Sequence, residues 1–372
     1  MQIPSRIKNV FLILLLWLAG GCASDRPPSG GPRDTTPLQV ILSDPAPLAV
    51  NVSTNTICLT FNHEVSVRQL LNTMIISPSI GEYDLAVNGR EAKINGFKPL
   101  KEGRTYILTL DKKLRDNNGR AFRAPFTIAF STGNVIDNGI ISGKVINTDF
   151  SPSTNALILA FAEPQEITET GNLLQREPDY LIQADASGVF CFNNIARGLY
   201  RIIAVNDRTG DLRYNAESEE SALCSTAIIQ TGSSDLLFRL SRLHRDTGRL
   251  LIKPASKLPP TGETGTISGT CFASGQYVIV EASSVTASYR TTASRDQKGM
   301  LLYSFGALPP GSYTISAFIP SGSKNPDPER QWNPGSIEPF QPAEPFGFYP
   351  EKVTVRPRWT TEHIDIRVIT SR

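Results

Sequence analysis

The side chains that most often carry proton transfer or bind metals give no catalytic pattern. The chain has three histidines, His63, His244 and His363. None is followed by a second histidine or cysteine within four residues, as a metal pair on one element would require. No Gly-x-Ser-x-Gly, His-Glu-x-x-His or glycine-rich phosphate loop occurs either. We therefore expect a protein that is not an enzyme, with no catalytic residue, no metal and no cofactor.

One acidic loop deserves comparison with a calcium site. Asp207, Gly210 and Asp211 stand together in NDRTGDLRYN, and oxygen ligands of this kind suit a hard cation. Two arginines, Arg208 and Arg213, interrupt the loop and leave few oxygen donors. We expect it to form a turn.

Four cysteines lie beyond the first segment: Cys58, Cys191, Cys224 and Cys271. Their spacing forms no paired pattern, so free thiols are the expected state. By the module boundaries given below, only Cys191 and Cys224 share a module. A disulfide between these two is the alternative, and an oxidising compartment would permit it.

Large aromatic side chains gather near the C-terminus, in a long proline-rich loop. Stacked aromatics bind sugars and peptides, and long loops in compact domains are often functional. A loop of this kind also needs large side chains to hold it on a sandwich, and this anchoring role is the favoured interpretation. The candidate binding-loop residues are Trp332, Phe340, Phe346, Phe348 and Tyr349.

The first residues predict a route out of the cytoplasm. Arg6 and Lys8 precede an apolar run, Val10 to Leu18, which Ala19-Gly20-Gly21-Cys22 follows. Nine helical residues span roughly 14 Å, about half a bilayer core, which is typical of a signal peptide and too short for a transmembrane helix. We expect residues 1–21 to be removed.

Cys22 then becomes the first residue of the mature chain. Small residues before a cysteine resemble the bacterial lipoprotein lipobox, although Leu18 stands four residues before Cys22 and not the usual three. The resemblance implies a thioether-linked diacylglycerol and a third acyl chain such as palmitate on Cys22. Two or more acyl chains hold a protein stably on a bilayer.

Composition excludes some partners and favours β-structure. Without Arg6 and Lys8, the 37 basic residues become 35, which equals the 35 acidic ones. A neutral chain without a run of basic residues lacks the positively charged surface that nucleic-acid binding requires. The 28 glycines and 27 prolines favour short strands separated by turns.

The pattern along the chain predicts an all-β fold of three sandwich modules. Residues 22–37 are a Pro/Gly/Ser-rich tether, and residues 38–134 contain alternating strands such as TICLTF, TYILTL and FTIAF with one helical turn or two near Val67–Met74. Two further modules, 138–247 and 263–372, flank a linker, 248–262.

The last two modules repeat the same features. Asp185 and Gly188 correspond to Asp296 and Gly299, where an aspartate three residues before a glycine predicts a tight turn with glycine at positive φ. A later Gly-x-Tyr in each copy is expected to bury its tyrosine; the tyrosines are Tyr200 and Tyr313.

Several motifs resemble known bacterial families. SDPAP, LTFNHEV, LKEGRTYILTL and FSTG resemble an Ig-like domain of surface-layer proteins, and the two later modules resemble the transthyretin-like, carboxypeptidase-regulatory sandwich. SGGPRDTTP, RQWNPG and VTVRPRW resemble segments of a group of Bacteroidetes lipoproteins. Asp34-Thr35-Thr36 is similar to an O-glycosylation signal of that phylum, which makes Thr35 a candidate site.

These resemblances imply a lipid-anchored outer-membrane protein that acts by contact. The leading hypothesis is a structural or adhesive string of β-modules, with the membrane and an envelope protein or glycan as partners and no nucleic acid. One alternative is a glycan- or peptide-binding subunit of an uptake or secretion system, and another is a hydrolase of unrecognised geometry. Ala23-Ser24-Asp25 lacks the acidic cluster that resembles a surface-export signal, so both membrane faces stay open.

Overall fold

The computed structural model describes most of the chain beyond its first segment. The described residues are 34–154, 156–164, 173–210, 212, 214–216, 218–241, 263–275, 277–322, 327 and 330–369. The predicted signal peptide, Cys22, His244, Asp211 and the linker 248–262 lie outside them. The predicted all-β class is confirmed, since the described helical elements are one five-residue helix, α2 (Val67–Leu71), and one short turn, η1 (Leu173–Gln175).

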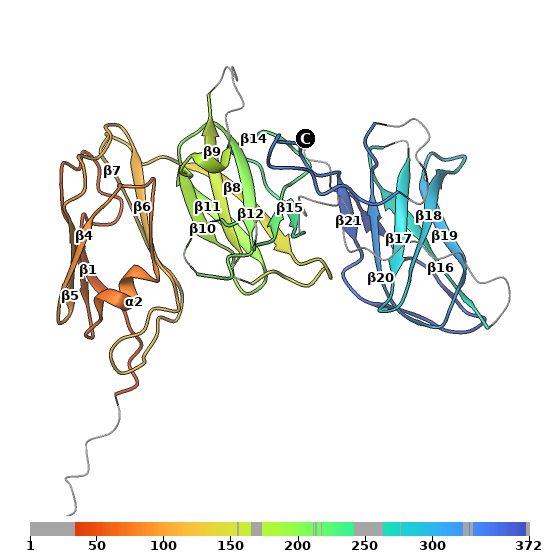
Figure 1. The fold of residues 1–372 in the computed structure, drawn as a ribbon, viewed down its shortest axis with the longest axis horizontal. Helices are drawn as coiled ribbons and strands as arrows, with labels where there is room; N and C mark the ends of the chain where they lie inside the picture. Colours follow the sequence, from red (N-terminus) through yellow and green to blue (C-terminus); the bar gives the residue numbers. More distant parts are fainter. Residues whose placement is uncertain are drawn as a thin grey trace, which may run out of the picture. The chain divides into compact units, whose positions relative to one another are not determined.

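The strands between residues 40 and 131, which we call the N-terminal module, form two sheets (orange in Figure 1). Alternation buries one face of each sheet, as Ile57, Leu59 and Phe61 show with at most 1% exposure. One sheet has the order β1 (Val40–Asp44), β2 (Ile57–Phe61), β5 (Glu91–Asn95), β4 (Asp84–Asn88), and the other β3 (Met74–Ser77), β6 (Thr105–Leu110), β7 (Phe126–Ser131).

The middle module spans residues 139–239 and also has two sheets. In the smaller sheet β15 pairs with β8 in parallel, whereas the strands of a hairpin are antiparallel. Its order is β11 (Val189–Ile195), β8 (Gly139–Ile146), β15 (Leu236–Arg239); the other sheet comprises β10 (Tyr180–Gln183), β9 (Leu157–Glu163), β12 (Leu199–Val205), β13 (Ser221–Ala222) and β14 (Ile229–Gln230).

The C-terminal module spans residues 265–367 (cyan to blue in Figure 1). Its two layers join at one corner, where β18 pairs with β19 only through Ser294 and Arg295. One layer contains β17 (Val278–Ser283), β18 (Ser288–Arg295), β20 (Gly311–Phe318), β21 (Phe346–Phe348) and β22 (Val353–Val355); the other contains β16 (Gly265–Phe272), β19 (Leu301–Leu308), β23 (Thr360–Thr361) and β24 (Ile366–Arg367).

The middle and C-terminal modules share equivalent turns, as their sequences predict. Asp185 Oδ1 accepts from the amide of Val189, and Asp296 Oδ1 accepts from the amide of Met300. Gly188 and Gly299 take φ values of 75° and 81°. The turn prediction is therefore confirmed in both copies.

The two modules also share equivalent aromatic contacts. The Tyr200 hydroxyl donates to the Ala196 carbonyl at 2.7 Å, and the Tyr313 hydroxyl donates to the Pro309 carbonyl at 2.8 Å. Both tyrosines are buried, as predicted, and each meets a second tyrosine edge-on at ring-centroid distances of 6.0 and 6.2 Å. The repeat in the sequence is thus a repeat in packing.

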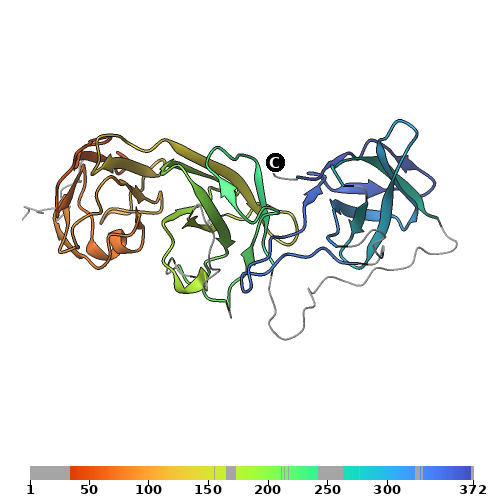
Figure 2. The ribbon, with the colours of Figure 1, turned by 90° about the horizontal axis from the view of Figure 1, so that it is seen from above.

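Strands β9 and β12 are buried on both faces. Ile158, Ala160 and Ile202 fill the core of the middle module, whereas the alternate residues belong to a second cluster. That second cluster includes side chains of the C-terminal module. Figure 2 shows the ribbon of these strands from above. Its members from β9 and β12 are Leu157, Leu159, Phe161, Ile203 and Val205.

Candidate functional site

The described histidines, His63 and His363, lie in different modules. His63 is half-buried after β2, and His363 is exposed before β24 with φ of 62°. Within the described ranges, no three His, Cys, Asp or Glu side chains come together as a metal site. No hydrogen bond joins His363 to a described hydroxyl or carboxylate, which a nucleophile and its base would require.

The acidic loop after β12 uses its carboxylate internally. Asp207 Oδ1 accepts from the Gly210 amide at 2.7 Å, and Oδ2 accepts from the Leu212 amide at 3.0 Å. Gly210 has φ of 71°, which suits glycine. These bonds form the turn that the sequence predicts.

The four described cysteines are free thiols. Cys191 is exposed on β11, while Cys224 and Cys271 are buried, so the alternative disulfide between Cys191 and Cys224 is not formed. Burial raises the pKa of Cys224 to about 11 and that of Cys271 to about 12. Both therefore stay protonated and unreactive at neutral pH.

The aromatic residues of the long loop lie against protein. Trp332 and Phe346 are each 4% exposed and meet edge-on at 5.1 Å between ring centroids. Phe340 and Phe348 are half-buried against the same cluster, and Tyr349 packs on the core of its own module. Because the faces of Trp332 and Phe346 are covered, these rings form no open stacking platform for a sugar.

The loop instead contacts the middle module. The Ala343 amide donates to the Cys224 carbonyl at 3.1 Å, and the Phe348 ring lies 5.2 Å from that of Phe150. The guanidinium of Arg239 stands between two rings, 4.1 Å from Phe150 and 5.2 Å from Trp332. Burial lowers the pKa of Arg239 to about 10, and the residue stays charged at neutral pH.

A second arginine supports the same contact from β12. Arg201 lies 4.8 Å from the centroid of the Phe340 ring and 3.7 Å from a carboxylate oxygen of Glu163. Arginine over an aromatic face contributes about 0.5–2 kcal/mol, more when the pair is desolvated.

Glu344 holds the loop in shape. Its carboxylate is buried and accepts from the amides of Ser321 and Asn333 at 2.6 and 2.9 Å, and it pairs with Arg330. The Glu344 carbonyl accepts from the Trp332 indole at 2.8 Å. One buried acid thus fixes both ends of the loop.

A local hydrogen bond and a glycine at positive φ fix the conformation of the Trp-Asn-x-Gly segment, residues 332–335. The Asn333 side chain accepts from the Gly335 amide at 3.0 Å, and Gly335 has φ of 83°. A Cβ there would lie 2.3 Å from the Gln341 carbonyl oxygen, so only glycine fits without a backbone shift.

Sequence analysis missed this inter-module contact, although a signal was present. The run ALILAFA of β9 and the IIAV segment of β12 are uninterrupted apolar stretches. A sandwich strand with one solvent face alternates, whereas a strand buried on both faces is apolar throughout. These runs indicate a partner on the outer face of the sheet.

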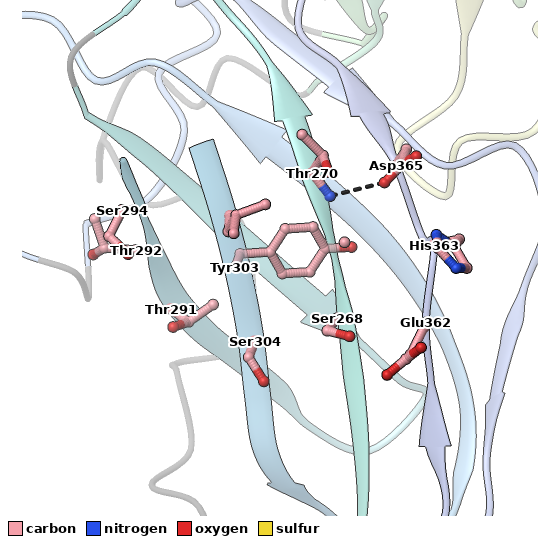
Figure 3. Close-up of a pocket in the computed structure, with 12 residues that line it drawn as sticks. Ser268, Thr270, Thr291, Thr292, Ser294, Tyr303, Ser304, Glu362, His363 and Asp365 are labelled. Atoms are coloured by element: carbon pink, nitrogen blue, oxygen red, sulfur yellow. Dashed lines mark hydrogen bonds between the residues drawn. The ribbon is translucent and has the colours of Figure 1, made fainter. Parts of the chain in front are cut away.

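The C-terminal module also carries a polar hollow of about 580 Å³, drawn in Figure 3. Its lining comes from β16, β18 and β19 and from the segment between β23 and β24. Sequence analysis did not single out this set, because hydroxyls on an outward strand face are ordinary. The lining residues are Ser268, Gly269, Thr270, Thr291, Thr292, Ser294, Leu302, Tyr303, Ser304, Glu362, His363 and Asp365.

Comparison with known proteins places the first module. A family model described as a bacterial Ig-like domain matches residues 34–132. The N-terminal module is a bacterial Ig-like domain. A comparison with curated protein sequences finds no match. Among the described residues, no helix is both long and apolar enough to cross a membrane.

Several solved structures are similar at low identity. A native fragment of Escherichia coli alpha-2-macroglobulin is 14% identical, with a TM-score of 0.21, over 77% of this chain and 94% of that one. The N-terminal part of the bacterial S-layer protein SbsC is 15% identical (TM-score 0.20; 45% and 40% covered). The Bacillus cereus major pilin subunit BcpA is 10% identical (TM-score 0.18; 52% and 67% covered).

Proposed function

We propose that the chain is a lipid-anchored, non-enzymatic protein of the bacterial cell envelope that acts as a stiff spacer and presents its surfaces to a partner. The observation that carries this proposal is the shared buried cluster of the middle and C-terminal modules. A contact of this kind suppresses independent motion of neighbouring sandwiches, because inter-domain motion is expected only where the interface is small or polar.

The side chains that could take part in a reaction support the same function. Asp207, Glu344 and Arg239 are engaged in hydrogen bonds, an ion pair or ring contacts within the chain. Cys224 and Cys271 are buried thiols. Asp207 holds a turn, Glu344 holds the long loop and Arg239 contacts the neighbouring module, so these groups serve the fold instead of meeting a substrate.

The anchor in this proposal is Cys22, on the outer membrane of a Bacteroidetes-like bacterium. The described chain begins at Asp34 and enters its first strand at Val40, so the modules follow the proposed anchor by a short tether. We also propose that the two later modules are transthyretin-like sandwiches. Thr35 is exposed in the tether and is the proposed site of O-glycosylation.

Fractionation of native-host cells tests the anchor. Cys22→Ala is expected to move the protein from the membrane pellet to the soluble fraction, and Cys191→Ala, a matched change at an exposed thiol, is expected to leave it in the pellet. If Cys22→Ala stays with the membrane, the anchor lies elsewhere.

Two further experiments test the membrane face and the modification. Protease treatment of intact cells distinguishes a surface-facing from a periplasmic protein. If the intact mass of the native protein shows no added hexoses, the proposed O-glycosylation of Thr35 is wrong.

A further inference from the structure

Hydroxyl-bearing residues of three strands contribute to the lining of the hollow in the C-terminal module (Figure 3). Cross-strand register places Ser268 of β16 opposite Ser304 of β19, and Thr270 opposite Leu302. Leu302 in turn lies opposite Ser294 of β18. Three strands thus contribute outward residues to one surface.

The rim of the hollow is fixed by close backbone contacts. Gly269 has no side chain, and a Cβ there would lie 2.1 Å from the Ile364 carbonyl oxygen. The Tyr303 hydroxyl donates to that carbonyl at 2.5 Å, and Asp365 Oδ1 accepts from the Thr270 amide at 2.8 Å. The segment carrying Glu362, His363 and Asp365 is therefore held against β16, and the hollow is preformed.

Apart from Tyr303 and Asp365, the polar side chains of the lining form no hydrogen bond or ion pair with a described residue. None of the lining serine and threonine hydroxyls donates to or accepts from a described residue, and neither Glu362 nor His363 forms a described hydrogen bond or ion pair. Leu302, 41% exposed, supplies an apolar patch in the middle. The hydroxyls involved are those of Ser268, Thr270, Thr291, Thr292, Ser294 and Ser304.

The charge of the hollow selects among ligands. Its described lining includes two carboxylates, Glu362 and Asp365, and neither lysine nor arginine. An anionic ligand would meet repulsion there, whereas a protonated amine would find a carboxylate partner. Neutral hydroxyls of a ligand pair with serine and threonine, which donate and accept equally well.

We propose that this hollow binds an oligosaccharide that carries free amino groups. Sugar hydroxyls would meet the strand hydroxyls, a sugar C–H face would rest on Leu302, and an amine would pair with Glu362. A volume of about 580 Å³ is within the range of about 300–1,000 Å³ typical of ligand pockets. This inference names a ligand for the surfaces that the protein is proposed to present. It does not depend on the lipid anchor, because the binding experiment tests the hollow and the fractionation experiment tests Cys22.

The test measures binding by calorimetry, with the full-length chain in detergent, at mildly acidic pH where sugar amines are protonated. The probes are a glucosamine hexamer, a glucose hexamer, a galacturonate hexamer and a lysine-rich peptide. We expect the glucosamine hexamer to bind best, the glucose hexamer more weakly and the galacturonate hexamer not at all. Ser304→Lys should abolish binding, and Glu362→Gln should weaken the glucosamine hexamer by about tenfold or more.

Two matched variants serve as controls. Ser312→Lys places the same side chain on an exposed position of β20, and Glu351→Gln removes an exposed carboxylate away from the described lining; both should bind as the natural chain does. The proposal is overturned if no hexamer binds at millimolar concentration or if the galacturonate hexamer binds best. It is also overturned if only the peptide binds, or if Ser304→Lys and Ser312→Lys behave alike.

Discussion

The guanidinium of Arg239 in the middle module lies 5.2 Å from the centroid of the Trp332 ring in the C-terminal module. Trp332 is 4% exposed, and its indole donates to the Glu344 carbonyl. The Arg239 guanidinium, the Trp332 ring and the buried Glu344 therefore lie together where the two modules are in contact. This point links the Trp-Asn-x-Gly segment of the sequence to the rigidity that the proposed function requires.

Trp332→Ala is expected to weaken the contact between the two modules. Truncating a buried tryptophan costs about 3–5 kcal/mol, because the apolar transfer free energy is lost and a cavity remains. Denaturant unfolding should show that loss in the free energy of unfolding of the C-terminal part. Limited proteolysis should cut the chain between the two modules faster.

Trp359→Ala is the matched control. Trp359 is 66% exposed, so its removal should change stability by no more than about 0.5 kcal/mol. Equal losses for the two variants would show that Trp332 is not the anchor of the interface.

Gly269→Ala is expected to disturb the hollow and the strand beside it. The added Cβ would lie 2.1 Å from the Ile364 carbonyl oxygen, so the backbone must shift at a cost of about 1–3 kcal/mol. Thermal unfolding measures the loss. Gly306→Ala is the control, because no atom lies within 4 Å of its added Cβ, and it should leave the melting temperature nearly unchanged.

The sequence predicted those features that depend on short-range patterns. Alternation in β2 identified the buried face of Ile57, Leu59 and Phe61, and a period of two survives in any sandwich. The Asp185–Gly188 turn was predictable, since the aspartate, the glycine and the amides that bond to them lie within five residues. Local chemistry alone determines such turns.

The inter-module contact could not be predicted with the same certainty. Trp332 meets Arg239 across 93 residues of sequence, and no periodicity specifies which outer face a proline-rich loop will cover. The hollow escaped prediction for a similar reason. An outward serine such as Ser304 looks the same in sequence whether it faces open water or a shaped surface formed by neighbouring strands.

Acid should reveal the contribution of the Asp185 turn. The Ser187 hydroxyl donates to this carboxylate, and that bond is the main reason why the pKa of Asp185 lies below its ordinary value of 3.8. A lowered pKa in the folded state contributes stability above the ordinary value, and the contribution disappears as pH falls through the folded pKa. The sign follows because acid protonates the unfolded chain first.

Asp185→Asn tests this by urea unfolding along a pH series. The variant should be less stable than the natural chain at neutral pH, and the difference should shrink below the ordinary aspartate pKa and vanish below the lower pKa of the folded state. Ser187→Ala should show the same convergence with a smaller difference, since it removes one donor and keeps the charge. A difference that stays constant into acid would mean that the turn acts through shape alone.

Thiol accessibility gives a separate check on the buried cysteines. Alkylation needs a thiolate that the reagent can reach, and burial raises the pKa of Cys224 to about 11 and that of Cys271 to about 12. Brief iodoacetamide treatment of the folded protein at mildly alkaline pH should therefore label Cys191, which is exposed on β11, and spare Cys224 and Cys271. Peptide mass mapping reads the labelled positions.

Denaturation provides the control for this experiment. In guanidinium the thiols of Cys191, Cys224 and Cys271 should all react, because unfolding removes the burial that raises the pKa values. Cys191→Ser should lose the label of the folded state without changing the denatured pattern at the other two. If Cys224 were labelled as fast as Cys191 before denaturation, the Cys224 carbonyl that accepts from Ala343 would also be exposed, and the close fit between the modules would be refuted.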